Sequence, residues 1–289
     1  MADRATAIPL TRRMTDTAGR TIAWCELGDP AGRPALVAHG SPGSRYQLLP
    51  LHASARAAGI RLIAPDRPGF GLTDPSEDRA FHSWDDDAIA LLDHLGLDSV
   101  PVVGFSGGAG YALGLAAAHP DRVEKLVLAC GMIPGAPAGE LRARLPLITL
   151  LYRACRYVPW VATAMLEGRG PFRSTRAANV DSWPAGDRRV MTDPASQALT
   201  APDGAEGMRQ GARAAVTDLA RYYRALPEPL EAISVPTVQL HGDADVNVPI
   251  AVARWARDRL PASRLVEIPD GGHYFLVENP APLLDALAG

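Results

Sequence analysis

The strongest constraint on the fold is the regular succession of two kinds of segment along the chain. Short apolar runs alternate with amphipathic stretches through the first half, a pattern typical of a parallel sheet wrapped by helices. The same succession returns near the C-terminus. It predicts an α/β fold with a mostly parallel central sheet flanked by helices. We expect strands over 21–27, 35–38, 61–64, 101–104, 123–129, 237–241 and 264–268, and helices near 51–58, 83–95, 108–119 and 280–288.

This succession breaks between residues 132 and 228, where prolines and glycines are scattered among helical pieces and no strand-like run appears. We therefore predict that 1–131 and 229–289 form the core and that 132–228 is an inserted helical cap. The insertion holds 13 arginines and 9 acidic residues, a net charge of +4, which leaves −7 for the rest of a chain whose total is −3. This charge could favour an anionic substrate, but a solvated charged surface is the simpler explanation.

The composition is that of an ordinary globular protein, with 289 residues, 47% hydrophobic and 21% charged. It lacks the basic footprint of nucleic-acid binding. No apolar stretch approaches the roughly 18 residues that span a bilayer. The first 20 residues lack the apolar run of a signal peptide, so we expect a cytoplasmic protein, either a monomer or a homodimer. Widely spaced Cys25, Cys130 and Cys155 form no CxxC pair, which indicates buried reduced thiols.

One serine stands in a segment that suits a nucleophile. The pattern G-x-S-x-G, with Ser106 at its centre, lies between a predicted buried strand and a predicted helix. This context is typical of a nucleophile elbow, a sharp strand-to-helix turn that needs small neighbours and exposes the serine hydroxyl. The helix N-terminus favours developing negative charge, and the Gly107 amide would supply one oxyanion donor. Gly104, Gly107 and Gly110 lack the G-x-G-x-x-G spacing of a dinucleotide-binding loop, which argues against an oxidoreductase.

A histidine and an aspartate complete a candidate triad. His273 lies in a glycine-rich loop after the last predicted strand, and of seven histidines only this one follows both serine and acid, as the order in such folds requires. Asp245, in the GDAD segment after the preceding strand, is the predicted acid. Asp243 is the alternative, which we interpret as a loop-shaping residue. The acid would hold the histidine tautomer and stabilise the imidazolium.

The loop 39–44 (HGSPGS) lies where a second oxyanion donor is needed. We expect the backbone N–H of Ser41 to donate and Gly40 to keep the approach open. A donor of this kind typically stabilises the oxyanion by about 3 kcal/mol. The turn 66–71 (DRPGFG) follows the next strand, and its glycines permit tight backbone geometry. We interpret this turn as structural, with contact to the substrate as the alternative.

Together these segments resemble the α/β-hydrolase family, from about residue 21 to the C-terminus. The motifs HGSPGS, DRPGFG, GFSGG, GDAD and GGH occur in the family's order, and their conjunction is more specific than any one of them. The resemblance implies a triad at the carboxyl edge of the sheet under an inserted cap, in the serine-nucleophile, esterase-like branch. Ser106 separates the chain from haloalkane dehalogenases and epoxide hydrolases, which use an aspartate nucleophile. Gly107 departs from the tryptophan of proline iminopeptidase-like enzymes and the methionine of carbon–carbon bond hydrolases.

We therefore expect a serine hydrolase that cleaves a carboxylic ester of a small to medium, largely hydrophobic substrate. Amide, thioester or carbon–carbon bond hydrolysis and perhydrolysis use the same residue types and stay open, as does a non-catalytic ligand-binding protein. The sequence has no HExxH, Cys/His cluster or Walker loop, so we predict neither a metal nor a cofactor. Ligand pockets are mostly apolar. The candidate substrate-binding residues are Gly40, Phe105, Tyr152, Tyr157, Trp160, Met165 and Trp183.

Overall fold

One mixed sheet organises the core. The computed structural model describes residues 8–76, 80–173 and 180–289. In these residues, eight strands form a sheet in the order β1-β2-β4-β3-β5-β6-β7-β8. β2 is antiparallel to both of its neighbours, and all other neighbouring strands are parallel, which confirms the predicted fold class. The strands are β1 (Arg12–Thr15), β2 (Thr21–Gly28), β3 (Arg33–Ala38), β4 (Ile60–Pro65), β5 (Val100–Phe105), β6 (Val123–Ala129), β7 (Thr237–Gly242) and β8 (Ser263–Ile268).

Each face of the sheet has its own hydrophobic core, because side chains alternate across a strand. On β5, Val102 belongs to one core and Val103 to the other. Helices α2, α3 and α9 pack on the first face through Leu91, Leu115 and Val252, whereas α1, α10 and α11 pack on the second. These helices are α1 (His52–Ala57), α2 (Asp85–His94), α3 (Ala109–Ala118), α9 (Ile250–Arg257), α10 (Phe275–Glu278) and α11 (Ala281–Ala288).

The predicted strands and helices of the core are all present, and their ends differ from the predicted ones by no more than two residues. The sequence did not predict β1, which has four mostly exposed residues and no apolar alternation. It also missed α9 and the single-turn α10. The three cysteines are buried and unpaired, as predicted. Within the described residues, no helix has both the length and the apolar character needed to cross a membrane.

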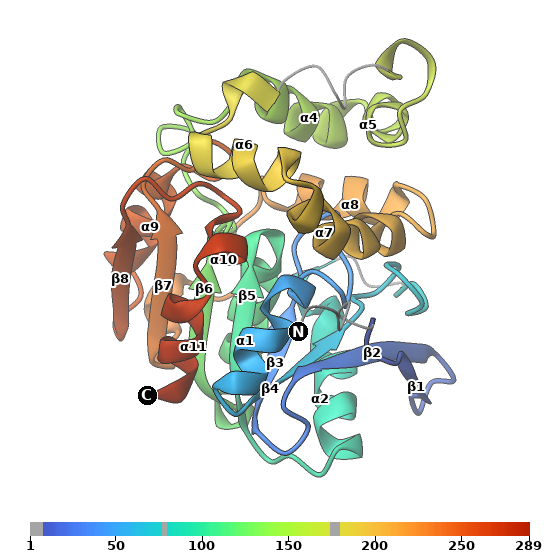
Figure 1. Cartoon of the computed structure of the whole chain (residues 1–289), viewed down its shortest axis with the longest axis vertical. Coiled ribbons are helices and arrows are strands. Elements are labelled where there is room, and N and C mark those ends of the chain that lie inside the picture. The colour runs from blue at the N-terminus through green and yellow to red at the C-terminus, as the bar shows by residue number, and fades with distance from the viewer. Residues whose placement is uncertain (1–7, 77–79, 174–179) are drawn as a thin grey trace, which may run out of the picture.

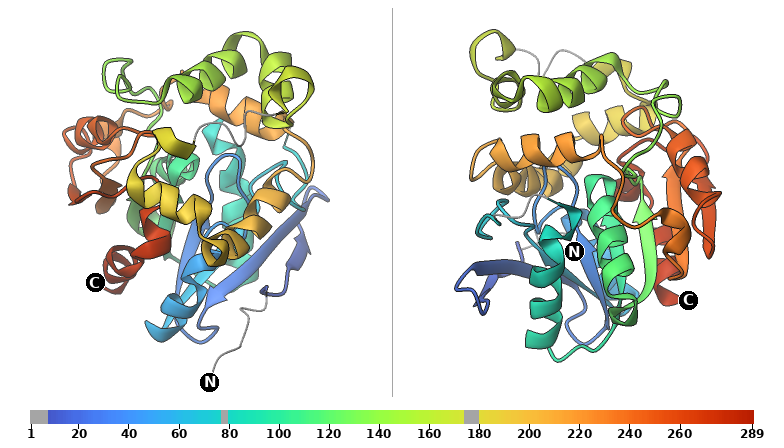
Figure 2. Two further views of the ribbon diagram at one scale, coloured as in Figure 1. Left: turned by 45° about the horizontal axis from the view of Figure 1, so that its top comes forward. Right: turned by 180° about the vertical axis from the view of Figure 1, so that it is seen from behind.

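Five helices that follow β6 form a layer above the carboxyl end of the sheet. Figure 1 shows α4 and α5 farthest from the sheet, with α6, α7 and α8 between them and the core. Figure 2 shows the same arrangement from two other directions. We call this group the α4–α8 layer, and its described residues contain no strand. Its helices are α4 (Pro146–Tyr157), α5 (Pro159–Leu166), α6 (Ala185–Thr192), α7 (Pro194–Gly207) and α8 (Arg213–Arg221).

Candidate active site

Ser106 stands at the carboxyl end of β5, near the centre of the sheet. Its φ of +50° is a left-handed backbone conformation that residues other than glycine rarely adopt. The turn is tight, since a Cβ on Gly108 would lie 1.9 Å from the carbonyl oxygen of Ala38. A Cβ on Gly104 would lie 2.8 Å from the Cα of Ala109, the first residue of α3. The G-x-S-x-G segment therefore forms the strained strand-to-helix turn that the sequence predicts.

Two other predicted residues meet Ser106 from separate loops. His273 follows β8, and its Nε2 lies 2.9 Å from the Oγ of Ser106. The Nδ1 of His273 lies 2.8 Å from the Oδ2 of Asp245, which follows β7. The other oxygen of Asp245 accepts the backbone N–H groups of Asn247 at 2.8 Å and Val248 at 2.9 Å. Hydrogen bonds thus connect the serine, the histidine and the aspartate in a continuous chain.

Within this hydrogen-bonded series, the charges of Asp245 and His273 stabilise each other. Burial alone would raise the pKa of Asp245, but the charge of His273 and hydrogen bonds from His241 and His273 hold that pKa well below its ordinary value. Burial would lower the pKa of His273, but Asp245 raises it above the ordinary histidine value. Asp243, the alternative acid, is exposed to solvent. An ionised Asp245 therefore orients a histidine whose Nε2 faces the serine hydroxyl.

A carboxylate that the sequence did not predict holds the loop of His273. Asp187 on α6 is buried. Its Oδ2 accepts the backbone N–H of His273 at 2.9 Å, and its Oδ1 accepts that of Tyr274 at 2.8 Å. A Cβ on Gly272 would lie 2.3 Å from this carboxylate, so the contact is close. No local sequence pattern marks Asp187, because His273 is 86 positions away.

The loop after β3 brings Ser41 beside the nucleophile elbow. A Cβ on Gly107 would lie 3.1 Å from the backbone nitrogen of Ser41, and one on Gly40 would lie 3.1 Å from the Cβ of Ser106. The Ser41 amide makes no hydrogen bond to another described residue, and its hydroxyl is buried without a partner among them. The Gly107 amide lies in the first turn of a helix, where N–H groups have no intrahelical acceptor. Both predicted oxyanion donors are therefore neighbours of Ser106.

The turn 66–71 holds this loop in place. The buried Arg67 donates to the carbonyl oxygens of His39 and Gly40 at 2.8 Å each. Its Nη2 also lies 2.7 Å from the Oδ2 of Asp218 on α8, and both partners are 1% exposed. Within the described residues, no member of this turn lines the cavity at Ser106. Arg67 therefore connects loop 39–44, the predicted oxyanion loop, to the α4–α8 layer.

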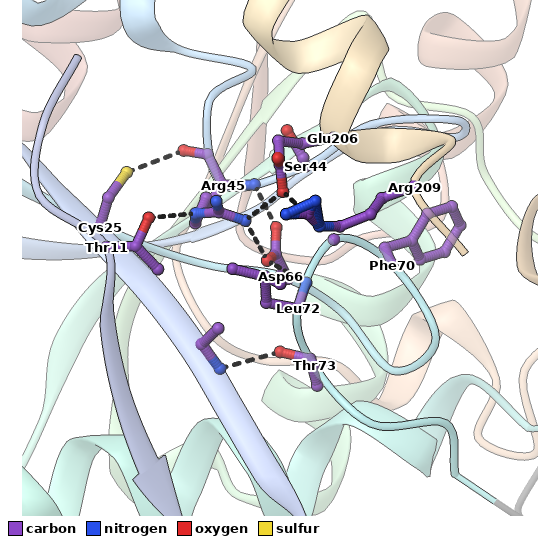
Figure 3. Close-up of polar contacts among 12 residues, drawn as sticks. Thr11, Cys25, Ser44, Arg45, Asp66, Phe70, Leu72, Thr73, Glu206 and Arg209 are labelled. Carbon is purple, nitrogen blue, oxygen red and sulfur yellow. Dashed lines mark hydrogen bonds and ion pairs between the residues drawn. The ribbon is translucent and has the colours of Figure 1, made fainter. Parts of the chain in front are cut away.

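Arg45 and Ser44 form a second connection between the same loop and α7. Figure 3 shows Arg45 between Asp66 and Glu206. Its Nη1 lies 2.6 Å from the Oδ2 of Asp66 and 3.0 Å from the Oε2 of Glu206. The backbone N–H of Ser44 donates to the Oδ1 of Asp203 at 2.7 Å. Burial raises the pKa of Asp203 to about 7, against the opposing effect of hydrogen bonds from Ser44 and Gln47.

A cavity of about 600 Å³ opens at Ser106, between the sheet edge and the α4–α8 layer. Of the predicted substrate-binding residues, Phe105, Tyr152 and Trp183 line it. Gly40 lies directly behind Ser106, as described above. The sequence did not predict several polar lining residues: Gln47, Gln197, Thr200, Asp203 and Asn247.

Three predicted substrate-binding residues lie away from this cavity, so their assignment was wrong. Tyr157 and Trp160 are 72% and 75% exposed, and Met165 packs against a hydrophobic core. On α4, Tyr152 faces the cavity. Tyr157 follows five residues later, which turns its side chain by about 140° around the helix axis. These residues were predicted to line the pocket because their side chains are apolar or aromatic. Which side of each helix faces the cavity depends on how the helices of the layer pack.

One group of the described residues has metal-ligand chemistry. Potential ligand atoms of Cys130, Asp245 and His273 lie within 4.8 Å of one another. Both ring nitrogens of His273 already have partners, in Asp245 and Ser106. Burial raises the pKa of the Cys130 thiol, which disfavours the thiolate that a metal would bind. These residues therefore fit a hydrogen-bonded chain better than a metal site.

A mostly parallel sheet with a serine elbow at its centre and a histidine–aspartate pair on the following loops defines the class of α/β-fold hydrolases. The chain matches the α/β-hydrolase fold family over residues 34–280, and it belongs to this family.

Relatives of known activity differ in their reactions. A 2-hydroxymuconate semialdehyde hydrolase of Pseudomonas putida is 29% identical over 254 residues, which cover 86% of this chain and 83% of the relative. A pimeloyl-[acyl-carrier protein] methyl ester esterase of Aromatoleum aromaticum is 32% identical over 259 residues, 86% of this chain and 94% of the relative. The structure of a bromoperoxidase from Bacillus anthracis aligns with a TM-score of 0.71 at 24% identity, covering 96% of this chain and 98% of that one. The last likeness bears on the fold alone.

Proposed function

We propose that this protein is a serine hydrolase that cleaves a carboxylic ester of a small to medium, largely hydrophobic molecule. One observation carries the proposal. The hydrogen-bonded chain Ser106–His273–Asp245 lies at the wall of a cavity of about 600 Å³. A nucleophile, a base and an orienting acid within hydrogen-bond reach are the arrangement that acyl transfer through a covalent intermediate requires.

In the proposed reaction, the Nε2 of His273 accepts the proton of Ser106 as the Oγ attacks the ester carbonyl carbon. The carbonyl electron pair moves onto oxygen, and the backbone N–H groups of Ser41 and Gly107 stabilise that charge by about 3 kcal/mol each. When the tetrahedral intermediate collapses, the C–O bond breaks and the alcohol leaves with the proton from His273. Asp245 stays ionised and stabilises the imidazolium, a role that its lowered pKa supports.

The second half of the reaction reverses these roles. Water enters the cavity, His273 removes one of its protons, and the resulting hydroxide attacks the acyl carbon. The bond between the acyl carbon and the Oγ of Ser106 then breaks, Ser106 regains its proton from His273, and the acid is released.

The cavity lining supports a neutral, hydrophobic acyl group. Its described residues are mostly apolar, with Phe105, Tyr152 and Trp183 among them, and they include no arginine or lysine. An anionic substrate would therefore find no counter-charge among these residues. Pockets of about 300–1,000 Å³ are usual for small-molecule ligands, which fits a medium-sized substrate. In this proposal residues 132–228 form the cap, since their helices supply one wall of the cavity.

Carbon–carbon bond hydrolysis is the second candidate. The Pseudomonas putida relative is a 2-hydroxymuconate semialdehyde hydrolase at 29% identity, and the same serine, histidine and aspartate could serve such a reaction. The Aromatoleum aromaticum relative, an ester esterase at 32% identity, favours the first candidate.

A panel of acyl donors tests the proposal. We expect wild-type protein to hydrolyse p-nitrophenyl esters, with an optimum acyl-chain length set by the depth of the cavity. Ser106→Ala should lose this activity and should not react with a fluorophosphonate probe, which labels activated serines. Turnover of a vinylogous diketone without turnover of any ester would favour the second candidate. Full ester hydrolysis by Ser106→Ala would contradict both.

A further inference from the structure

Three consecutive helices of the α4–α8 layer each contribute a carboxylate that binds a loop or turn next to the candidate active site. Asp187 on α6 binds the loop of His273. Asp203 on α7 binds Ser44 in the oxyanion loop. Asp218 on α8 binds Arg67, which donates to that same loop. Asp187 and Asp218 are 1% exposed, so neither is a solvated surface charge.

We propose that Asp187, Asp203 and Asp218 are positioning residues, through which the layer aims the base and the oxyanion donor at the substrate. The layer is then part of the catalytic arrangement as well as a wall of the cavity. This inference rests on the proposed function, because it concerns how Ser106 becomes reactive. It assigns roles to residues outside the predicted triad and oxyanion hole.

Asp218 acts on the oxyanion donor through a rigid peptide unit. The carbonyl of Gly40 and the N–H of Ser41 belong to one planar peptide group, so a partner that fixes the carbonyl also aims the N–H. Arg67 donates to this carbonyl at 2.8 Å while its Nη2 is paired with Asp218 at 2.7 Å. His39 Nδ1 lies 2.8 Å from the same oxygen. The ion pair thereby sets the direction of the Ser41 amide.

Asp203 reaches the other side of Gly40. Its Oδ2 accepts from the Nε2 of Gln47 at 3.2 Å, and the Oε1 of Gln47 accepts the backbone N–H of Gly40. Gly40 is therefore bound at its N–H through Asp203 and at its carbonyl through Asp218. With both groups fixed, the peptide has little freedom to rotate away from the oxyanion position.

Asp187 positions the base. Its two oxygens bind two successive N–H groups, those of His273 and Tyr274, so an asparagine of the same shape would replace one acceptor by a donor. One buried N–H would lose its partner, and the loop would shift. The charged and titratable groups that face His273 are Asp245, Asp187 and Arg144, with the Cys130 thiol nearby. The negative charge of Asp187 raises the pKa of His273, and its removal should lower that pKa.

The experiment compares three asparagine variants in their reaction with a fluorophosphonate probe, which reports on Ser106 whatever the natural substrate is. The control is Asp181→Asn, which changes an exposed acid in the segment between α5 and α6. The measured quantity is the second-order rate constant of labelling between pH 5 and pH 9. Thermal unfolding of each variant shows that it is folded at the assay temperature, so that the constant describes native protein.

We expect Asp187→Asn to slow labelling about 10- to 100-fold, the effect of a misplacement on the ångström scale, and to move the acid limb to lower pH. Asp203→Asn should slow labelling, and Asp218→Asn should slow it without moving that limb, since both act on the oxyanion donor and not on His273. Asp181→Asn should match wild type. Wild-type rates and profiles in all three variants would overturn the inference. Failure of wild-type protein to label would instead refute the proposed function and the inference with it.

Discussion

Asp245→Asn replaces one carboxylate oxygen by an NH2 group, and the hydrogen bonds of the site determine how that change affects His273. The Oδ1 of Asp245 accepts two backbone N–H groups, from Asn247 and Val248, and its Oδ2 faces the Nδ1 of His273. An asparagine can satisfy the two backbone donors only by turning its oxygen toward them. Its NH2 group then points at His273. The ring must accept at Nδ1 and carry its proton on Nε2, where it cannot take the proton of Ser106.

The structure gives a magnitude for this effect. In the opposite orientation the NH2 group would face two buried N–H donors, each left unpaired at a cost of about 1–3 kcal/mol. The inactive tautomer is therefore the stable one. A carboxylate-to-amide change that traps the wrong tautomer lowers kcat by about 10⁴-fold, which corresponds to about 5.5 kcal/mol of activation free energy. Asp243→Asn, at an exposed position, should stay within about twofold of wild type.

The assay is steady-state hydrolysis of the best p-nitrophenyl ester by wild type and both variants, with thermal unfolding to show that each is folded. We expect Asp245→Asn to be nearly inactive and Asp243→Asn to be normal. The assignment of the acid would be wrong if Asp245→Asn kept more than a tenth of the wild-type kcat. It would also be wrong if Asp243→Asn lowered kcat more than Asp245→Asn did.

Three further predictions use other parts of the structure. Arg67→Met leaves the buried Asp218 without its main partner. In a urea titration it should lower the free energy of unfolding by about 3–5 kcal/mol. A decrease below about 1 kcal/mol would contradict the burial of this ion pair. Trp183→Ala should change KM for long acyl chains, because Trp183 lines the cavity, whereas Trp160→Ala, on the outer surface, should not; equal effects would exclude our placement of the cavity. Since the pKa of His273 is raised and the base must be neutral, kcat/KM should rise with pH through a midpoint above about 6.5, and a midpoint below this value would argue against His273 as the base.

Much of the core could be predicted because its signals are local. Buried parallel strands are short apolar runs, and the glycines around Ser106 are required within a few residues by the 1.9 Å and 2.8 Å approaches that their Cβ atoms would make. His273 and Asp245 follow strands in the order that the sheet imposes, so their proximity to Ser106 could be expected from topology alone.

The helical layer could not be predicted in the same way. The composition of α4 and α5 marks Tyr152, Tyr157 and Trp160 equally as pocket residues, yet only the first faces the cavity. The sequence likewise did not predict the contacts of Asp187 and Asp218. Their partners lie 86 and 151 positions away, and no sequence periodicity predicts a contact between a helix of the layer and a loop so distant in the chain.

The α4–α8 layer leaves the core after β6 and returns at β7, and these two strands are neighbours in the sheet. Where the chain enters and leaves the layer, a Cβ on Gly135 would lie 2.9 Å from the Cα of Ala225. Both junctions therefore lie close together, so recombination could exchange the whole layer without disturbing the order of the strands. Such a chimera would receive a new cavity wall, but it would also lose the acids at 187, 203 and 218 unless the incoming helices supplied equivalents. In this protein, a graft that changes substrate range is thus expected to change turnover as well, and directed evolution of the layer should retain these three positions while it varies the cavity lining.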